Sequence, residues 1–189
     1  MSAGVLTPPP GVRLLTAEEY GVLPDDGRRT ELIHGVVVDM PQPRVRHGRA
    51  CSNINLVLRN YVDPRRLGTV TSNDTGVRTE QDPDTVRGAD VSFYSFSRLP
   101  EGSDPDHYDI IPELVFEVRS PSERNAAVRA KVAEYHAVGV LAVCVVDSEA
   151  KAVTVYPKVG QVRTHAYDDP VQLPEVFPDF VIPLRQFFI

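Results

Sequence analysis

Two acidic residues lie within apolar, strand-like runs of the sequence, where an ionised side chain is costly. Asp90 opens the run ADVSFY at residues 89–94, and Glu117 lies inside the run PELVFEVRS at residues 112–120. An ionised acid buried without a partner costs on the order of several kcal/mol, so it must take up a proton, pair with a cation or bind a metal. If these strands are neighbours, Asp90 and Glu117 form a metal-binding pair.

Lys131 lies near this pair in the expected order of elements. Val128, Lys131, Val132 and Tyr135 follow the spacing of one helical face, which places the lysine at the edge of an apolar stripe. A lysine near Glu117 can orient a water molecule or stabilise charge on a transferring phosphate. The alternative is a lysine whose stem packs on the helix while its ammonium group reaches solvent.

Together these residues match the requirements of phosphodiester hydrolysis, which needs a divalent cation, an activated water molecule and positive charge for the transition state. Asp90 and Glu117 offer hard oxygen ligands, which favour Mg²⁺, with Mn²⁺ as a possible substitute. Lys131 supports water activation and transition-state charge, and Glu31 is a candidate for a further carboxylate. The sequence therefore predicts a metal-dependent nuclease.

The charge of the chain is unevenly distributed along the sequence. The net charge is −6, but residues 41–68 contain six arginines and one aspartate, a local charge of +5. Nucleic acids respond to this local field, so Arg46 and Arg49 are candidate phosphate contacts and DNA is the expected partner. A solvated helix face without a ligand explains the same charges equally well.

The local patterns predict a mixed sheet flanked by helices. A capping box at residues 16–19 predicts a short helix that ends near Gly21, and a second capping box at residues 120–123 predicts a helix that ends at Gly139. Between them we expect a bent strand or hairpin at 32–40 with Glu31 at its entrance, and a helix at 47–62. Strands are expected at 69–73, 75–79, 89–94, 112–120, 140–146 and 151–156.

The helix before Gly139 joins two of these strands, and such crossovers join parallel neighbours. We expect one domain over residues 1–189, with residues 1–14 as a loose N-terminal arm and residues 184–189 packed on the core. The longest apolar run, residues 140–146, is too short to cross a membrane, and no secretion signal is visible, so a cytoplasmic location is expected. Cys51 and Cys144 are expected to fill the core.

The chain resembles the Uma-two family of candidate restriction endonucleases, which belong to the PD-(D/E)XK nuclease superfamily. The resemblance extends from about Leu15 to Phe188. Each motif is weak alone, but their order and spacing are specific. The motifs are TAEEY at 16–20, ELIHG at 31–35, RH at 46–47, DVSF at 90–93, PELVFEV at 112–118, SPS at 120–122, the segment 131–135 and AVGV at 137–140.

The resemblance implies a restriction-endonuclease-like α/β core with a β-rich N-terminal extension. It implies Asp90 and Glu117 as metal ligands, Glu31 as a supporting acid, Lys131 as the catalytic lysine and His47 as a phosphate contact. A homodimer is a family-level expectation, because cutting both strands commonly needs two sites.

Two positions depart from the family pattern. Ala89 stands where the signature has proline, and Arg119 stands where the superfamily has its lysine. Arginine cannot act as a general base, so Arg119 is a candidate nucleic-acid contact. If Arg119 instead pairs with Glu117, the chain is an inactive nucleic-acid-binding or scaffold protein on a nuclease fold.

Overall fold

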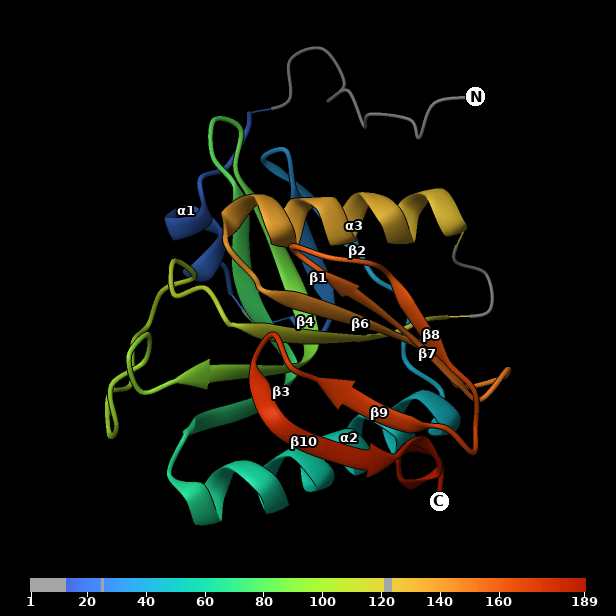
Figure 1. Ribbon diagram of the computed structural model, residues 1–189. Coiled ribbons are helices and arrows are strands. Elements are labelled where there is room, and N and C mark those ends of the chain that lie inside the picture. The colour runs from blue at the N-terminus through green and yellow to red at the C-terminus, as the bar shows by residue number, and fades with distance from the viewer. Residues whose placement is uncertain (1–12, 25, 121–123) are drawn as a thin grey trace.

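A mixed β-sheet with helices on both faces forms the body of the protein. The computed structural model describes residues 13–24, 26–120 and 124–189, and Figure 1 shows α2 and α3 on opposite sides of the sheet. The eight-stranded sheet has the order β2-β1-β4-β5-β6-β7-β8, with β3 also paired to β4. The bounds are β1 Thr30–Ile33, β2 Val36–Asp39, β3 Gly68–Glu80, β4 Thr85–Ser95, β5 Leu114–Val118, β6 Ala142–Asp147, β7 Ala152–Pro157 and β8 Arg163–His165.

The two long helices bury separate apolar clusters against this sheet. Helix α2, Val45–Val62, packs residues such as Ile54 and Leu58 against Phe116 of β5. Helix α3, Asn125–Val138, packs its predicted stripe of Val128, Val132 and Tyr135 on the opposite face of the sheet. Both helices use apolar residues at i, i+3 and i+4 spacing for this packing. Because they pack on opposite faces, the expectation of a sheet flanked by helices is confirmed.

Strand β4 is the centre of the sheet and has three partners. Strand β3 pairs with β4 along its whole length, from Thr85 to Ser95. The other edge of β4 is therefore shared: β1 pairs at Val86, and β5 pairs from Val91 to Phe93. Strands β1 and β5 thus diverge between these points and leave a fork along one edge of β4.

Strand β4 also changes the face to which its apolar residues point within this fork. Ala89 packs in the cluster under α3, whereas Val91 packs in the cluster under α2. Regular alternation would place both residues on the same face. The change occurs at Asp90, next to the irregular register between Ser72 and Thr75 of β3. The strand therefore turns at the position that carries the predicted metal ligand.

The crossover predicted from the sequence connects β5 to β6. These strands are parallel, with Glu117 opposite Val145, and α3 lies between them in the chain. Gly139 ends α3 with φ of +113°, as its predicted role of C-cap requires. The predicted capping box at 120–123 falls partly on residues 121–123, which lie outside the described residues. The described part of α3 begins at Asn125, with Arg124 as its N-cap.

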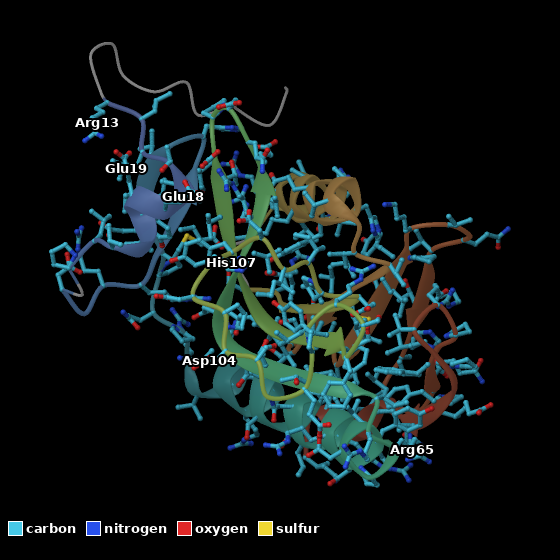
Figure 2. The ribbon with its side chains drawn as sticks, turned by 90° about the vertical axis from the view of Figure 1, so that its left-hand side faces the viewer. Arg13, Glu18, Glu19, Arg65, Asp104 and His107 are labelled. Carbon is cyan, nitrogen blue, oxygen red and sulfur yellow. The ribbon has the colours of Figure 1, made fainter. Side chains whose placement is uncertain are left out.

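The N-terminal part confirms the predicted helix and hairpin. Thr16 caps α1, Ala17–Gly21, and both hydrogen bonds of the capping box with Glu19 are present. Strands β1 and β2 form a hairpin whose turn has positive φ at His34 and Gly35. The predicted arm falls mainly on residues 1–12, which lie outside the described residues. Arg13 forms an ion pair with Glu19, and the surroundings of α1 are seen in Figure 2.

Three expectations about strands need correction. The two strands expected at 69–73 and 75–79 are one strand, β3, because Asn73 and Asp74 adopt positive φ in a bulge and pairing resumes at Thr75. The strand expected to open at residue 89 begins earlier, and Asp90 lies inside it. The paired strands β9, Pro170–Leu173, and β10, Phe177–Pro183, were not expected.

The C-terminal residues pack on the core as expected. The short helix η2, Leu184–Phe187, buries Leu184 and Phe187 in the cluster beside α2. Strands β9 and β10 add Phe177 and Phe180 to the same cluster and lie beside α2 in Figure 1. Among the described residues, no helix is long and apolar enough to span a bilayer.

Candidate active site

The predicted acidic residues meet at the fork between β1 and β5. Asp90 comes from β4, Glu117 from the end of β5 and Glu31 from β1. Because Val91 faces Phe116 in the antiparallel β4–β5 pair, Asp90 and Glu117 lie next to that pair toward the same end. Lys131 of α3 spans the fork, with its Nζ 3.4 Å from Glu117 Oε2 and 3.7 Å from Glu31 Oε1. The structure thus brings these four residues together.

Asp90 is buried and surrounded by hydrogen-bond donors. Its Oδ2 accepts a 2.6 Å hydrogen bond from the backbone N–H of Val118 and lies 3.3 Å from Nε2 of His47. Its Oδ1 lies 3.5 Å from the guanidinium group of Arg29. Only 5% of the Asp90 side chain is exposed, so these contacts supply the compensation that a buried carboxylate needs. The pKa of His47 is raised, chiefly by its hydrogen bond to Asp90.

Glu117 has weaker compensation than Asp90. The hydroxyl of Tyr135 donates a 2.8 Å hydrogen bond to Oε1, and Lys131 is the nearby cation. Burial raises the pKa of Glu117 to about 7, and the neighbouring carboxylates of Asp90 and Glu31 also raise it, against the opposing effects of Lys131 and Tyr135. Near neutral pH, Glu117 therefore exchanges a proton readily and gains from any added positive charge.

Glu31 is held by a second set of ion pairs under α3. Its Oε2 accepts a 2.9 Å hydrogen bond from Arg87, and its Oε1 accepts one from the backbone N–H of Gly88. Arg87 also makes a two-pronged contact with Glu134 of α3, at 2.7 and 2.9 Å. The β4 edge lacks a continuous strand partner in the fork. There Glu31 accepts the backbone N–H of Gly88 on β4, and Asp90 accepts that of Val118 on β5. The same two hydrogen bonds therefore stabilise the backbone of the fork and position the two carboxylates.

The site contains more acids than permanent cations. Among the described residues, five carboxylates are connected through ion pairs to three permanent cations, with His47 as a fourth group that can take up charge. The carboxylates are Asp74, Asp90, Glu31, Glu117 and Glu134, and the cations are Arg29, Arg87 and Lys131. With all five carboxylates ionised, the set has a charge of −2 when His47 is neutral and −1 when it is protonated, and a proton on Glu117 makes either value one unit more positive. Carboxylate oxygens with excess negative charge suit a hard divalent cation such as Mg²⁺.

Arg119 lies at the edge of the site, beside the turn after β6. Its guanidinium group is 4.0 Å from Asp147, while Glu117 is paired with Lys131. Among the ion pairs between described residues, none joins Arg119 to Glu117. The alternative in which Arg119 neutralises Glu117 is therefore not favoured. Arg119 instead lines a small surface hollow with Ser148 and Glu149.

The predicted basic residues of α2 line a neighbouring cavity of about 350 Å³. Arg46 and Arg49 are exposed there, together with Lys151 and Phe188. The same cavity includes Ser148 and Glu149, which also line the hollow beside Arg119. Among the described residues, no ion pair involves Arg46 or Arg49. By contrast, Arg59 pairs with Asp63, so the basic stretch is divided between a paired end and an exposed end.

Several residues at the site were not expected from the sequence. Arg29 precedes β1 and bridges Asp90 and Asp74, with a 2.7 Å hydrogen bond from Nε to Asp74. Tyr135 was expected only as part of an apolar stripe, yet its hydroxyl reaches Glu117. Cys51 packs against the core cluster beside α2, as expected, but it is only partly buried and lies 3.5 Å from Nδ1 of His47. The i, i+4 spacing of His47 and Cys51 on α2 is the signal that could have revealed this contact.

The arrangement of the sheet, the crossover helix and the acidic fork is that of a restriction-endonuclease-like nuclease fold. A solved structure described as a putative nuclease belonging to DUF820, from Anabaena variabilis ATCC 29413, matches with a TM-score of 0.79 and 21% identity. The match covers 92% of this chain and 97% of the other, and it shows a shared fold.

The sequence comparison identifies the family. A model of the Uma2 family, described as "Putative restriction endonuclease", matches residues 17–185. The chain therefore belongs to this family. No curated protein matches the chain.

Proposed function

We propose that this protein is a metal-dependent DNA endonuclease that hydrolyses phosphodiester bonds. The observation that carries the proposal is the fork itself, where Lys131 Nζ lies 3.4 Å from Glu117 and 3.7 Å from Glu31, beside the buried Asp90. Membership of the Uma2 family supports a nuclease, and the excess of carboxylates in the site supports a divalent cation. Mg²⁺ is the proposed cofactor, with Mn²⁺ as a substitute.

Asp90 and Glu117 are the proposed ligands of this cation. When bound, the cation would neutralise charge on the scissile phosphate and favour ionisation of a water molecule. Asp90 is held in place by the Val118 N–H, His47 and Arg29, so its position does not depend on the cation. Glu117, with a pKa of about 7, is only partly ionised at neutral pH and ionises further when positive charge is added.

Lys131 is the proposed catalytic lysine. Its side chain is only 17% exposed, and its ammonium group lies between Glu117 and Glu31. From this position it can orient the attacking water and stabilise the negative charge that develops on the phosphate. Glu31 then has a supporting role, because together with Glu117 it fixes the position of the lysine. Arg87 in turn holds Glu31.

Arg46, Arg49, His47 and Arg119 are the proposed nucleic-acid contacts. Arg46 and Arg49 line the exposed cavity on α2, and the hollow beside Arg119 shares Ser148 and Glu149 with it. A positively charged surface next to an acidic centre attracts the phosphate backbone to the site despite the net charge of −6. In this proposal His47 contacts two groups: the DNA phosphate and Asp90, which its Nε2 already contacts.

Cleavage of supercoiled plasmid and of single-stranded DNA by the purified full-length chain tests this function. We expect nicked or linear products with Mg²⁺ or Mn²⁺ and none with a chelator. Asp90→Asn and Glu117→Gln keep the size of the side chains but remove a ligand charge, so each should reduce cleavage on the order of 1,000-fold.

Asp63→Asn is the matched control, because Asp63 forms an ion pair with Arg59 at the C-terminal end of α2, away from the fork. It should cleave like the wild type. Cleavage that persists in both Asp90→Asn and Glu117→Gln would refute the assigned site, and metal-independent cleavage would refute the cofactor.

A further inference from the structure

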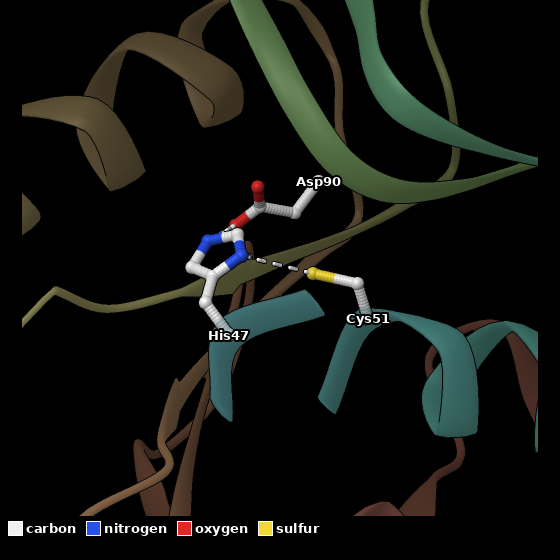
Figure 3. A group of neighbouring side chains, drawn as sticks. All are labelled: His47, Cys51 and Asp90. Carbon is white, nitrogen blue, oxygen red and sulfur yellow. Dashed lines mark hydrogen bonds and ion pairs between the residues drawn. The ribbon is translucent and has the colours of Figure 1, made fainter. Parts of the chain in front are cut away.

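His47, Cys51 and Asp90 form a second group of metal-ligand side chains on the opposite side of Asp90 from Glu117. One ring nitrogen of His47, the thiol sulfur and a carboxylate oxygen all lie within 4.8 Å of one another. In Figure 3, His47 and Cys51 rise from α2, and the imidazole lies between the thiol and the Asp90 carboxylate on β4. The cluster is therefore assembled by two elements that the fold holds together.

We propose that His47, Cys51 and Asp90 form a zinc site that competes with the catalytic cation for Asp90. Thiolate and imidazole ligands favour Zn²⁺ over Mg²⁺, which prefers oxygen ligands alone. Three protein ligands leave a fourth position for water. When Asp90 binds zinc at this site, it can no longer hold the catalytic cation together with Glu117, and nuclease activity stops. The inhibitory part rests on the proposed nuclease function, but zinc binding itself does not.

The distances suit this metal. Cys51 Sγ is 3.5 Å from His47 Nδ1, and two tetrahedral ligands at Zn–N and Zn–S bond lengths are separated by about 3.5 Å. The Asp90 carboxylate contacts the other ring nitrogen, Nε2, at 3.3 Å. To bind a metal placed at Nδ1 and Sγ, this carboxylate must turn toward Nδ1 and release Nε2. Zinc and the present His47–Asp90 contact are therefore alternatives.

The cluster also has space and access for an ion with its water. His47, Cys51 and Asp90 line a cavity of about 340 Å³ that opens between α2 and the bulge of β3. Asp74, Asn73 and Ser72 form the β3 side of this cavity, so further oxygen atoms face the open ligand position.

Titration of the full-length, metal-free protein with Co²⁺ tests the site without any nuclease assay. Cobalt bound to a thiolate gives a near-ultraviolet charge-transfer band, and we expect this band to saturate at one equivalent and to disappear when Zn²⁺ is added. Mg²⁺ should leave it unchanged. Cys51→Ala should abolish the band, and His47→Gln and Asp90→Asn should weaken cobalt binding by at least about 10-fold.

Cys144→Ala is the matched control, because Cys144 is the other cysteine and is fully buried in the core. The proposal predicts an unchanged band in this variant. A thiolate band that survives in Cys51→Ala, or its absence from the wild type, would overturn the zinc site.

A labelling experiment on the wild type covers the case in which a variant does not fold. Zn²⁺ should slow alkylation of Cys51 at least about 10-fold, as read by mass spectrometry of its peptide, whereas Mg²⁺ should not. Equal labelling with and without Zn²⁺ would count against the site.

A final comparison links the site to activity. Zn²⁺ should inhibit Mg²⁺-dependent cleavage in the wild type and in Cys144→Ala, with the ratio of rates with and without Zn²⁺ returning toward one in Cys51→Ala. Equal inhibition in Cys51→Ala would refute the competition. A protein that binds cobalt through Cys51 but cuts no DNA would refute the nuclease proposal and leave the zinc site standing.

Discussion

The two carboxylates proposed to share one cation have opposite surroundings. Asp90, on the α2 side, accepts a backbone N–H from Val118 and contacts both His47 and Arg29. Among the described residues, Glu117, on the α3 side, has one lysine and one tyrosine hydroxyl as partners, and further acids nearby. Asp90 is thus compensated by the protein itself, whereas Glu117 lacks sufficient positive charge.

Because of this difference, the two carboxylates would contribute to a metal site in different ways: one supplies a fixed ligand position, and the other changes its ionisation when the cation binds. A carboxylate with fixed donors keeps its place whether or not a cation is present. A carboxylate with a pKa of about 7 gains most when a cation arrives, because the cation replaces its proton. In the proposed metal site, the fork therefore combines one ligand that is held in place, Asp90, with one that ionises when the cation binds, Glu117.

The largest contrast is expected in the stability of the two isosteric variants at pH 8. Asp90→Asn leaves His47 without its anion and Arg29 with Asp74 alone, and should reduce the free energy of unfolding by about 3 kcal/mol. Glu117→Gln removes a poorly compensated charge and should increase it by at most about 3 kcal/mol. Urea denaturation without metal measures both. If the two variants change stability in the same direction, the contrast between the carboxylates is wrong.

Replacing Lys131 removes the permanent cation from the Glu117 side. Lys131→Met should reduce Mg²⁺-dependent cleavage about 100-fold, because both water orientation and transition-state charge lose support. It should also move the pH profile upward, since Lys131 lowers the pKa of Glu117. Lys158→Met is the control, because this exposed lysine lies beyond β7. A drop in rate with an unshifted pH profile would show that Lys131 does not act by lowering the pKa of Glu117.

The Glu117 carboxyl also predicts how stability depends on pH. Its pKa is about 7 in the folded protein against an ordinary value of 4.5, so between these values the folded state binds the additional proton. Stability from this group is therefore present below pH 4.5 and is lost as pH rises through 7. From pH 5 to 6.5, the wild type should lose up to about 2 kcal/mol relative to Glu117→Gln. Parallel denaturation series at these pH values measure the difference.

Magnesium supplies a second measurement of the same titration. Because binding ionises Glu117, the apparent Mg²⁺ affinity of the wild type should rise with pH up to about 7 and then level. Glu117→Gln should lack this rise. Calorimetric titration at pH 6 and pH 8 tests the expectation, and equal affinity at both values would contradict it.

The sequence indicated the elements and several site residues because the signals were local. Asp90 and Glu117 stood out as acids in apolar runs, and the helical spacing placed Lys131 toward the sheet. The crossover rule then predicted the parallel pairing of β5 and β6, which the structure confirms. These inferences needed only periodicity and chain order.

Other features depend on contacts between distant segments and have no local signal. Arg29 reaches Asp90 because the β1–β2 hairpin and the β3 bulge meet beside the fork. The change of face at Asp90 arises from the irregular pairing of β3, which apolar alternation cannot reveal. Strands β9 and β10 were missed, since Pro170 and Pro183 stand at their ends and Pro178 lies within β10, and proline disfavours a strand assignment.

Replacing Tyr135 should give the smallest effect on stability and cleavage. It tests whether one hydrogen bond to Glu117 controls the pKa of this carboxyl group. Tyr135→Phe removes the 2.8 Å hydrogen bond to Oε1 while keeping the buried ring, so it should cost about 1 kcal/mol of stability. Since this bond lowers the pKa of Glu117, cleavage should fall a few-fold at pH 6.5 and approach the wild-type rate at pH 8.5. Tyr94→Phe, a buried tyrosine on β4, is the control. A loss of rate independent of pH would mean that Tyr135 acts only through packing.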